Sequence, residues 1–211
     1  MTEKRRYDLV IFDFDGTLSD SGDWFLSIVD DLAQRFRFRS VSDDEIEALR
    51  NKTTREVIAY LGIARWKLPL IAAHVRRRFA KSTDQIELFD GIRAMLATLS
   101  DAGVRMVLCS SNAEANVRAV LGADAARFGD YYCGSGLFGK VRKFRRVLAD
   151  AGLAPERVLS IGDETRDLEA ARAVGLGAGA VLWGYANPDA LIAMTPDAIF
   201  ATPGDIIAYL T

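Results

Sequence analysis

The 211-residue chain is predicted to fold as an α/β protein, with a Rossmann-like parallel sheet as its core and an inserted α-helical domain. Three observations support this fold class. Short, unbroken apolar runs recur along the chain, as is typical of strands that are buried on both faces of a parallel sheet. Patterns with helical spacing lie between most of these runs. One long interval, from about residue 20 to residue 84, contains helical patterns but no strand pattern.

The core elements are predicted from the alternation of these two patterns. Strands are expected at residues 9–12, 104–109, 158–161, 178–182 and, more briefly, 198–200. Helices are expected at about residues 91–102, 113–122, 141–151, 165–174 and 204–210. Because the helices connect parallel strands, the crossovers should be right-handed.

The interval without strands is predicted to be a separate helical domain. Apolar residues recur at helical spacing between residues 24 and 36, and Ser42 with Glu45 forms a capping box before the next helix. Two more helical segments follow, at residues 55–61 and 66–79. We therefore predict a core domain of residues 1–19 and 85–211 and a helical domain of residues 20–84.

Composition limits the class of protein and its partners. A formal net charge of −2 provides no overall field for nucleic acid or anionic membrane, and the basic runs at 76–78 and 142–146 fit the solvated faces of helices. No segment approaches the roughly 20 apolar residues that span a bilayer, and residues 1–6 lack the apolar stretch of a signal peptide. Cys109 and Cys133 are predicted to be reduced, buried thiols. We expect a cytoplasmic protein; the sequence does not indicate its oligomeric state.

Two carboxylates directly follow the first predicted strand. Asp13 and Asp15 are two residues apart, so their side chains can point the same way from the strand end, where open α/β sheets bind ligands. Two like charges so close favour a bound cation or a shared proton. An EF-hand is excluded because Gly16 occupies the fourth loop position instead of the sixth. An ordinary strand-end turn is the alternative.

Three further groups lie at or near later strand ends. Ser110 ends the second strand before a helix, where it can bind an oxyanion or simply cap that helix. Lys140 precedes the helix at 141–151, where it can turn into a site or remain solvated. Asp163 and Asp167 follow the third strand, with N-capping as the alternative role. Together these groups can hold a hard cation and a phosphoryl group.

In this order the motifs resemble those of the haloacid dehalogenase-like superfamily, in its phosphatase branch. Asp13-Phe-Asp-Gly-Thr17 is similar to the first motif, Ser110 to the second, Lys140 to the third and the segment 162–167 to the fourth. The helical insert occupies the position of that family's cap domain. The resemblance covers nearly the whole chain, and its finer likeness is to the phosphoglycolate phosphatase-like group. One departure is that no proline follows Lys140.

The resemblance implies a Mg²⁺-dependent phosphoric monoester hydrolase. It implies that Asp13 is the nucleophile and forms an aspartyl-phosphate, while Asp15 acts as general acid and base. Asp13, the backbone carbonyl of Asp15 and Asp163 are the implied metal ligands. Ser110 and Lys140 are the implied phosphate-binding residues.

Some points stay open at this stage. Asp167 is expected to support the site, for example by orienting Lys140, and Glu164 is a candidate contact for a metal-bound water. The implied substrate is a small phosphorylated metabolite, with phosphoglycolate as one candidate. The alternatives are a phosphomutase acting on a sugar phosphate and a phospho-accepting signalling module similar to a receiver domain.

Overall fold

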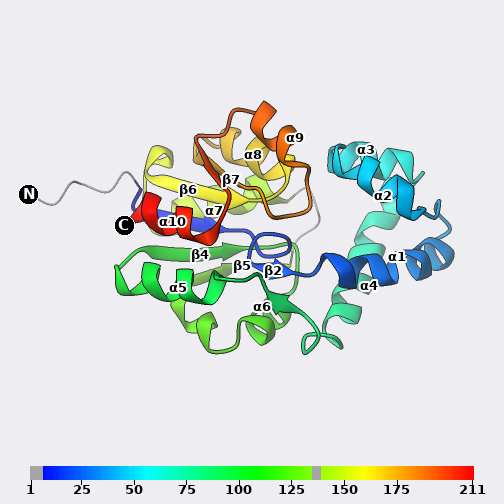
Figure 1. Cartoon of the computed structure of the whole chain (residues 1–211), viewed down its shortest axis with the longest axis horizontal. Coiled ribbons are helices and arrows are strands. Elements are labelled where there is room, and N and C mark those ends of the chain that lie inside the picture. Colours follow the sequence, from blue (N-terminus) through cyan, green and yellow to red (C-terminus); the bar gives the residue numbers. More distant parts are fainter. Residues whose placement is uncertain (1–6, 135–138) are drawn as a thin grey trace, which may run out of the picture.

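The computed structural model describes residues 7–134 and 139–211. Residues 1–6, for which no signal peptide is predicted, and residues 135–138 lie outside the described residues. Figure 1 shows a sheet with helices on both faces and a separate group of helices set to one end of it. In the two described ranges, no helix is long and apolar enough to cross a membrane.

The sheet has six strands, all parallel to their neighbours. They are β1 (Leu9–Phe12), β4 (Arg105–Cys109), β5 (Asp130–Tyr132), β6 (Val158–Gly162), β7 (Gly177–Val181) and β8 (Ala198–Phe200). Their spatial order is β5-β4-β1-β6-β7-β8. This is the Rossmann order, which reverses direction between β1 and β6. The predicted α/β class with a parallel, Rossmann-like sheet is confirmed.

Helices cover both faces of the sheet, and each face has its own apolar core. One face carries α5 (Ile92–Asp101), α6 (Glu114–Leu121) and α10 (Pro203–Leu210). The other carries α7 (Lys140–Ala151), α8 (Thr165–Arg172) and α9 (Pro188–Ala193). Three short 3₁₀ turns, η1 (Arg65–Lys67), η2 (Gly122–Arg127) and η3 (Pro155–Arg157), complete the described helical segments.

Strand β1 explains why its sequence is apolar without interruption. Val10 and Phe12 point into the first core, whereas Leu9 and Ile11 point into the second. All four side chains are at most 1% exposed. Because successive strand residues face opposite sides, only a strand covered on both faces needs apolar residues at every position.

The helical insert leaves and rejoins the core through a short antiparallel pair of strands, β2 (Ser19–Asp20) and β3 (Glu87–Leu88). Its helices are α1 (Gly22–Phe36), α2 (Asp43–Arg50), α3 (Thr54–Tyr60) and α4 (Leu68–Phe79). The predicted capping box of Ser42 and Glu45 is present at the start of α2. The position of this cap in the chain fits the predicted fold, while the domain limits at residues 20 and 84 stay a prediction.

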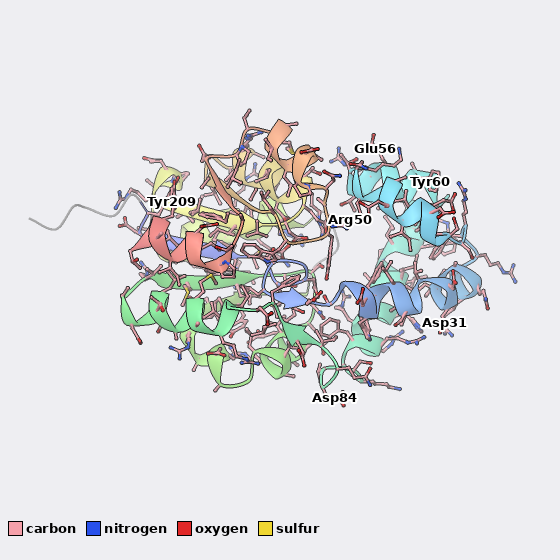
Figure 2. The ribbon with its side chains drawn as sticks, in the orientation of Figure 1. Asp31, Arg50, Glu56, Tyr60, Asp84 and Tyr209 are labelled. Carbon is pink, nitrogen blue, oxygen red and sulfur yellow. The ribbon has the colours of Figure 1, made fainter. Side chains whose placement is uncertain are left out.

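The cap contacts core loops that follow the strand ends. Arg50, which Figure 2 shows at the boundary between α2 and the core, donates from Nε to the Tyr185 carbonyl at 3.0 Å and from Nη2 to the Gly184 carbonyl at 3.2 Å. The Thr54 hydroxyl donates to Glu164 Oε2 at 2.8 Å. Arg76, on α4, donates to the Ser111 carbonyl at 3.3 Å. The cap is therefore tied to the loops that carry the predicted site.

The core packing predicts a sharp difference between two leucines that both lie on helices. Leu96, on α5, is fully buried, whereas Leu70, on α4, is 52% exposed. We expect Leu96→Ala to lower the free energy of unfolding by about 2–5 kcal/mol, because it leaves a cavity. Leu70→Ala, the matched control, should change it by less than about 0.5 kcal/mol. Urea denaturation of both variants measures this, and similar losses at the two positions would contradict the assignment of the core.

Candidate active site

The reversal of strand order brings two acidic residues together. Asp13 directly follows β1 and Asp163 directly follows β6, and these strands are neighbours in parallel register. The Asp13 backbone N–H donates to the Ile161 carbonyl at 2.9 Å. Since parallel strands end at the same edge, the two side chains emerge side by side at the point where open α/β sheets bind ligands.

Three buried carboxylates meet there. Among the described residues, Asp13, Asp163 and Asp167 each offer an oxygen, and these oxygens lie within 4.8 Å of one another. Each of the three residues is at most 6% exposed. The carboxylate of Asp15 is directed elsewhere, toward Ser21. Its predicted contact with a metal through the backbone carbonyl stays a prediction.

Lys140 is the cation that joins two of these acids. Its Nζ donates to Asp13 Oδ2 at 2.7 Å and also forms an ion pair with Asp167. Burial lowers the pKa of the Lys140 ammonium, but the carboxylates of Asp13 and Asp167 outweigh it and raise this pKa above its ordinary value. The structure corrects one detail, since Lys140 is the first residue of α7 and does not precede the helix. The expected pairing of Lys140 with Asp167 is present.

Asp13 and Asp167, the two acids that pair with Lys140, have unequal electrostatic surroundings. Burial raises the pKa of Asp13, against the opposing effect of the Lys140 ammonium. For Asp167, burial acts in the same direction, but Lys140 and Arg166 hold its pKa below the ordinary value. The charge of Lys140 is thus shared unevenly, and Asp167 is the better compensated of the two carboxylates.

Asp163 has the least favourable surroundings for a negative charge. It accepts hydrogen bonds from the Thr17 hydroxyl at Oδ1 and from the Tyr185 backbone N–H at Oδ2, both at 2.9 Å. Both donors are neutral. Burial, followed by the nearby carboxylates of Glu164, Asp167 and Asp13, raises its pKa well above the ordinary value. A cation at this position would relieve that repulsion.

Glycines let the surrounding loops close on Asp163. Gly16 has a φ of +79°, and a Cβ there would lie 2.2 Å from Asp163 Oδ2. A Cβ on Gly184 would lie 2.2 Å from the Cβ of Asp163. Any larger residue at either position would displace the carboxylate, so the first motif needs its glycine for close approach as well as for its turn.

Asp15 is held apart from the acid cluster by neutral groups. The Ser21 hydroxyl donates to its Oδ1 at 3.0 Å. Ser21 and the side chain of Asn112 both act to lower the pKa of Asp15. Because Ser21 gives its only hydroxyl hydrogen to Asp15, the Tyr185 hydroxyl must donate to Ser21 Oγ, 2.7 Å away. Burial and then the charge of Asp13 raise the pKa of Asp15 to about 6.

Ser110 lies at the end of β4, the other neighbour of β1. Its side chain is buried, and its Oγ accepts from the Asn112 N–H at 2.9 Å. In that bond Ser110 is the acceptor, so its own hydroxyl hydrogen can be donated to another group. Lys143 donates to the Ser110 carbonyl, which places it beside the loop and not in the position of Lys140.

The structure adds residues that the sequence patterns do not reveal. Arg166 is partly buried beside the acids and pairs with Glu164 Oε1 at 2.7 Å, while Glu164 Oε2 accepts from Thr54 of the cap. The carboxylate of Glu164 is thus directed to these two partners. Arg166 stands three residues after Asp163 inside an acidic motif, a spacing that could have marked it. Tyr185 carries no such signal, because it reaches the site from the loop after β7.

These features define a class of site. Buried carboxylates paired with a lysine lie at the carboxyl ends of β1 and β6, and a buried hydroxyl follows the neighbouring strand β4. Such a set suits the binding of a hard cation together with a phosphoryl group.

Comparison with known proteins identifies the family. The family model described as haloacid dehalogenase-like hydrolase matches residues 10–181. The chain is 33% identical over 204 residues to phosphoglycolate phosphatase of Synechococcus elongatus, covering 96% of both chains. It is also 30% identical over 190 residues to tyrosine-protein kinase PtkA of Mycobacterium tuberculosis, covering 86% of this chain and 64% of that one. A crystal structure of a predicted phosphatase from Clostridium acetobutylicum has the same fold, with a TM-score of 0.81, 21% identity and coverage of 96% and 97%.

The chain therefore belongs to the haloacid dehalogenase-like hydrolases, with a likeness to the phosphoglycolate phosphatases of that family. The predicted family, its phosphoglycolate phosphatase-like branch and the phosphatase class of enzyme are confirmed by these matches.

The uncompensated charge of Asp163 predicts that its removal stabilises the metal-free protein. In Asp163→Asn, the amide oxygen can accept from the Tyr185 N–H and the amide nitrogen can donate to the Thr17 hydroxyl. We expect a gain in the free energy of unfolding of the order of 1 kcal/mol at pH 7.5 with chelator present.

The raised pKa of Asp163 determines how the stability gain of Asp163→Asn changes with pH. Between the ordinary carboxyl value of 3.8 and the higher folded-state value, the folded protein binds more protons than the unfolded chain. Wild-type stability therefore falls as pH rises through this window, and the advantage of Asp163→Asn should shrink toward pH 4. Urea denaturation at both pH values measures it. A variant that is less stable than wild type at pH 7.5 would show that Asp163 is well compensated.

Proposed function

We propose that this hydrolase is a Mg²⁺-dependent phosphatase that cleaves a small phosphate monoester through an aspartyl-phosphate on Asp13. The observation that carries the proposal is the convergence of Asp13, Asp163 and Lys140 at the reversal of strand order. An anionic nucleophile can approach an anionic phosphate ester only where positive charge offsets both.

The donor set fits a magnesium ion. Asp13 and Asp163 offer buried carboxylate oxygens from two loops, and oxygen is the ligand atom that Mg²⁺ prefers. The third acid, Asp167, is occupied by Lys140, which supports a role in orienting that lysine. The backbone carbonyl of Asp15 is the remaining proposed protein ligand. When bound, the ion supplies neutralising charge for the phosphoryl oxygens.

The chain's own residues account for the first chemical step. A carboxylate oxygen of Asp13 forms a bond to phosphorus as the bond from phosphorus to the ester oxygen breaks. Lys140 and the hydroxyl of Ser110 bind phosphoryl oxygens and stabilise the spreading negative charge. Asp15 gives its proton to the leaving ester oxygen, and its pKa of about 6 leaves part of it protonated near neutral pH.

The second step returns Asp13 to its starting form. Asp15, now a carboxylate, takes a proton from water as the water oxygen attacks phosphorus, and the bond from phosphorus to Asp13 breaks. The hydrogen bond from Ser21 and the influence of the Asn112 side chain favour the ionised form of Asp15 in this step.

The position of the cap supports the proposal that the substrate is small. Arg50 and Thr54 of the cap hydrogen-bond to loops at the site, and a cap held this close favours a small ester over a protein substrate. Because the relative with 33% identity is named a phosphoglycolate phosphatase, phosphoglycolate is the first ester to test. The free thiols of Cys109 and Cys133 support a reducing compartment, and we propose the cytoplasm.

The reaction products distinguish the proposed phosphatase from proteins that transfer or keep the phosphoryl group. A phosphomutase would return it to a sugar, and a signalling module would keep it on Asp13. The similarity to PtkA adds transfer to another protein acceptor as an outcome to measure. Release of inorganic phosphate in each turnover distinguishes the proposed phosphatase from all three.

The direct test is a screen of phosphate esters with Mg²⁺, with and without chelator. We expect turnover in the wild type and a loss of at least about 10³-fold in Asp13→Asn, because the amide is a poor nucleophile. An acid-quenched sample should carry phosphate on the peptide that contains Asp13, detected by mass spectrometry. Asp84→Asn, at an exposed aspartate labelled in Figure 2, is the matched control and should remain fully active. Undiminished turnover by purified Asp13→Asn would refute the assignment.

Metal binding should also be visible without turnover. At 100 times its dissociation constant, Mg²⁺ should stabilise the wild type by about 2.7 kcal/mol and raise its melting temperature. Asp163→Asn should lose this response, because the variant lacks one of the two proposed carboxylate ligands. Differential scanning calorimetry with increasing Mg²⁺ measures it, and an equal rise in the two proteins would place the ion elsewhere.

A further inference from the structure

The last residue of cap helix α2 binds a loop of the core. Arg50 donates from Nε to the Tyr185 carbonyl at 3.0 Å and from Nη2 to the Gly184 carbonyl at 3.2 Å. Its own backbone carbonyl accepts from the Asn187 N–H at 3.0 Å. One residue of the cap therefore binds three backbone groups in the loop between β7 and α9.

The same loop also holds Asp163. The Tyr185 N–H donates to Asp163 Oδ2 at 2.9 Å, and the Thr17 hydroxyl donates to Oδ1 at the same distance. Thr17 belongs to the loop that follows β1, so its bond does not involve the cap. One oxygen of Asp163 is therefore held by the core alone, and the other is held by a loop that Arg50 binds.

A single peptide group joins Arg50 to Asp163. The Gly184 carbonyl and the Tyr185 N–H belong to the same peptide unit, and none of the peptide bonds in the described residues is cis. In a trans peptide these two groups point in opposite directions and rotate together, because the unit is planar. Arg50 binds the carbonyl end, and Asp163 accepts from the N–H end. Fixing the carbonyl therefore fixes the direction of the N–H.

This peptide unit depends on such an external support. Gly184 has no side chain to restrict its backbone rotation. A Cβ at that position would lie 2.2 Å from the Cβ of Asp163, so the close approach leaves no room for one. The orientation of the unit is then defined by its hydrogen bonds, and the bond from Arg50 exists only while α2 lies against the loop.

We propose that Arg50 is a positioning residue that couples docking of the cap to the orientation of Asp163. With α2 docked, Arg50 holds the peptide unit of residues 184 and 185 so that its N–H meets Asp163 Oδ2. When the cap moves away, the unit loses this support and the carboxylate loses its fixed donor. The inference rests on the proposed phosphatase function, in which Asp163 is a ligand of the cation.

A second arginine of the cap provides a matched control. Arg78, on α4, pairs with Asp31 of α1 at 2.9 Å, so this ion pair lies inside the cap. The side chains of Arg50 and Arg78 are similarly exposed, at 42% and 39%. Replacing Arg78 therefore removes the same charge from the cap and leaves the bonds to the loop between β7 and α9 in place.

The proposed coupling works in both directions. If a docked cap orients Asp163 and so raises the affinity for Mg²⁺, bound Mg²⁺ must favour the docked cap by the same factor. The Asn187 N–H reports docking, because its acceptor is the Arg50 carbonyl. Its hydrogen exchange can be followed without turnover.

The first measurement is the dissociation constant of Mg²⁺, by isothermal titration calorimetry on the full chain. We expect Arg50→Ala to weaken binding about fivefold, as for one lost hydrogen bond, and Arg78→Ala to leave it unchanged. Loss of a positive charge alone would strengthen the binding of a cation, so the sign of the change separates positioning from a charge effect. Arg50→Lys keeps the charge without the two-armed guanidinium, and its dissociation constant should fall between those of wild type and Arg50→Ala.

The second measurement is hydrogen exchange at the Asn187 N–H, by NMR. Mg²⁺ should slow this exchange about fivefold in the wild type and less than about twofold in Arg50→Ala. Circular dichroism establishes that each variant is folded, and Arg50→Lys supplies the test if the alanine variant does not fold.

An unchanged or tighter Mg²⁺ dissociation constant in the folded Arg50 variants would overturn the inference, and so would equal slowing of exchange in wild type and variant. A wild type that binds no Mg²⁺ would instead refute the proposed metal site and with it the proposed function. The same holds for an Asp163→Asn variant that binds Mg²⁺ as tightly as the wild type does.

Discussion

The ion pair of Lys140 with Asp13 and Asp167 is the interaction on which the site depends. The fold brings three carboxylates into a space that excludes water, where like charges repel most strongly. Lys140 and Arg166 together do not neutralise these three acids and Glu164, and the raised pKa of Asp163 reflects the excess negative charge. Removing the lysine would leave Asp13 and Asp167 without the cation that they share, and breaking a buried ion pair typically costs about 3–5 kcal/mol. The residual negative charge is what the proposed cation would offset.

Topology explains why this unfavourable cluster forms at all. The burial of apolar side chains on both faces of the sheet stabilises the strand order in which β1 and β6 are neighbours. Burial of those side chains contributes to the free energy of folding. The acids follow the strands directly, beyond the apolar cores. The cap then touches the same loops through Arg50, Thr54 and Arg76. The free energy of apolar burial thereby holds together carboxylates that would otherwise repel one another.

The sequence predicts the central strands and the motif residues well, because both depend on local pattern. Strand β1 is apolar at every position, and Asp13 follows it directly. The edge strand β5 was missed, since it has only three residues and begins with an aspartate. Helix α9 was missed because its six residues are too few to show a helical period.

Residues that reach the site through tertiary contacts could not be predicted in this way. Tyr185 is 164 positions from Ser21, and Thr54 is 110 positions from Glu164.

The most direct measurement is a crystal structure with Mn²⁺ in place of Mg²⁺, collected for anomalous scattering. One anomalous peak bound by carboxylate oxygens of both Asp13 and Asp163 is the predicted result. An ion held by other residues, in crystals of an active protein, would contradict the central claim that these two strand ends share one cation.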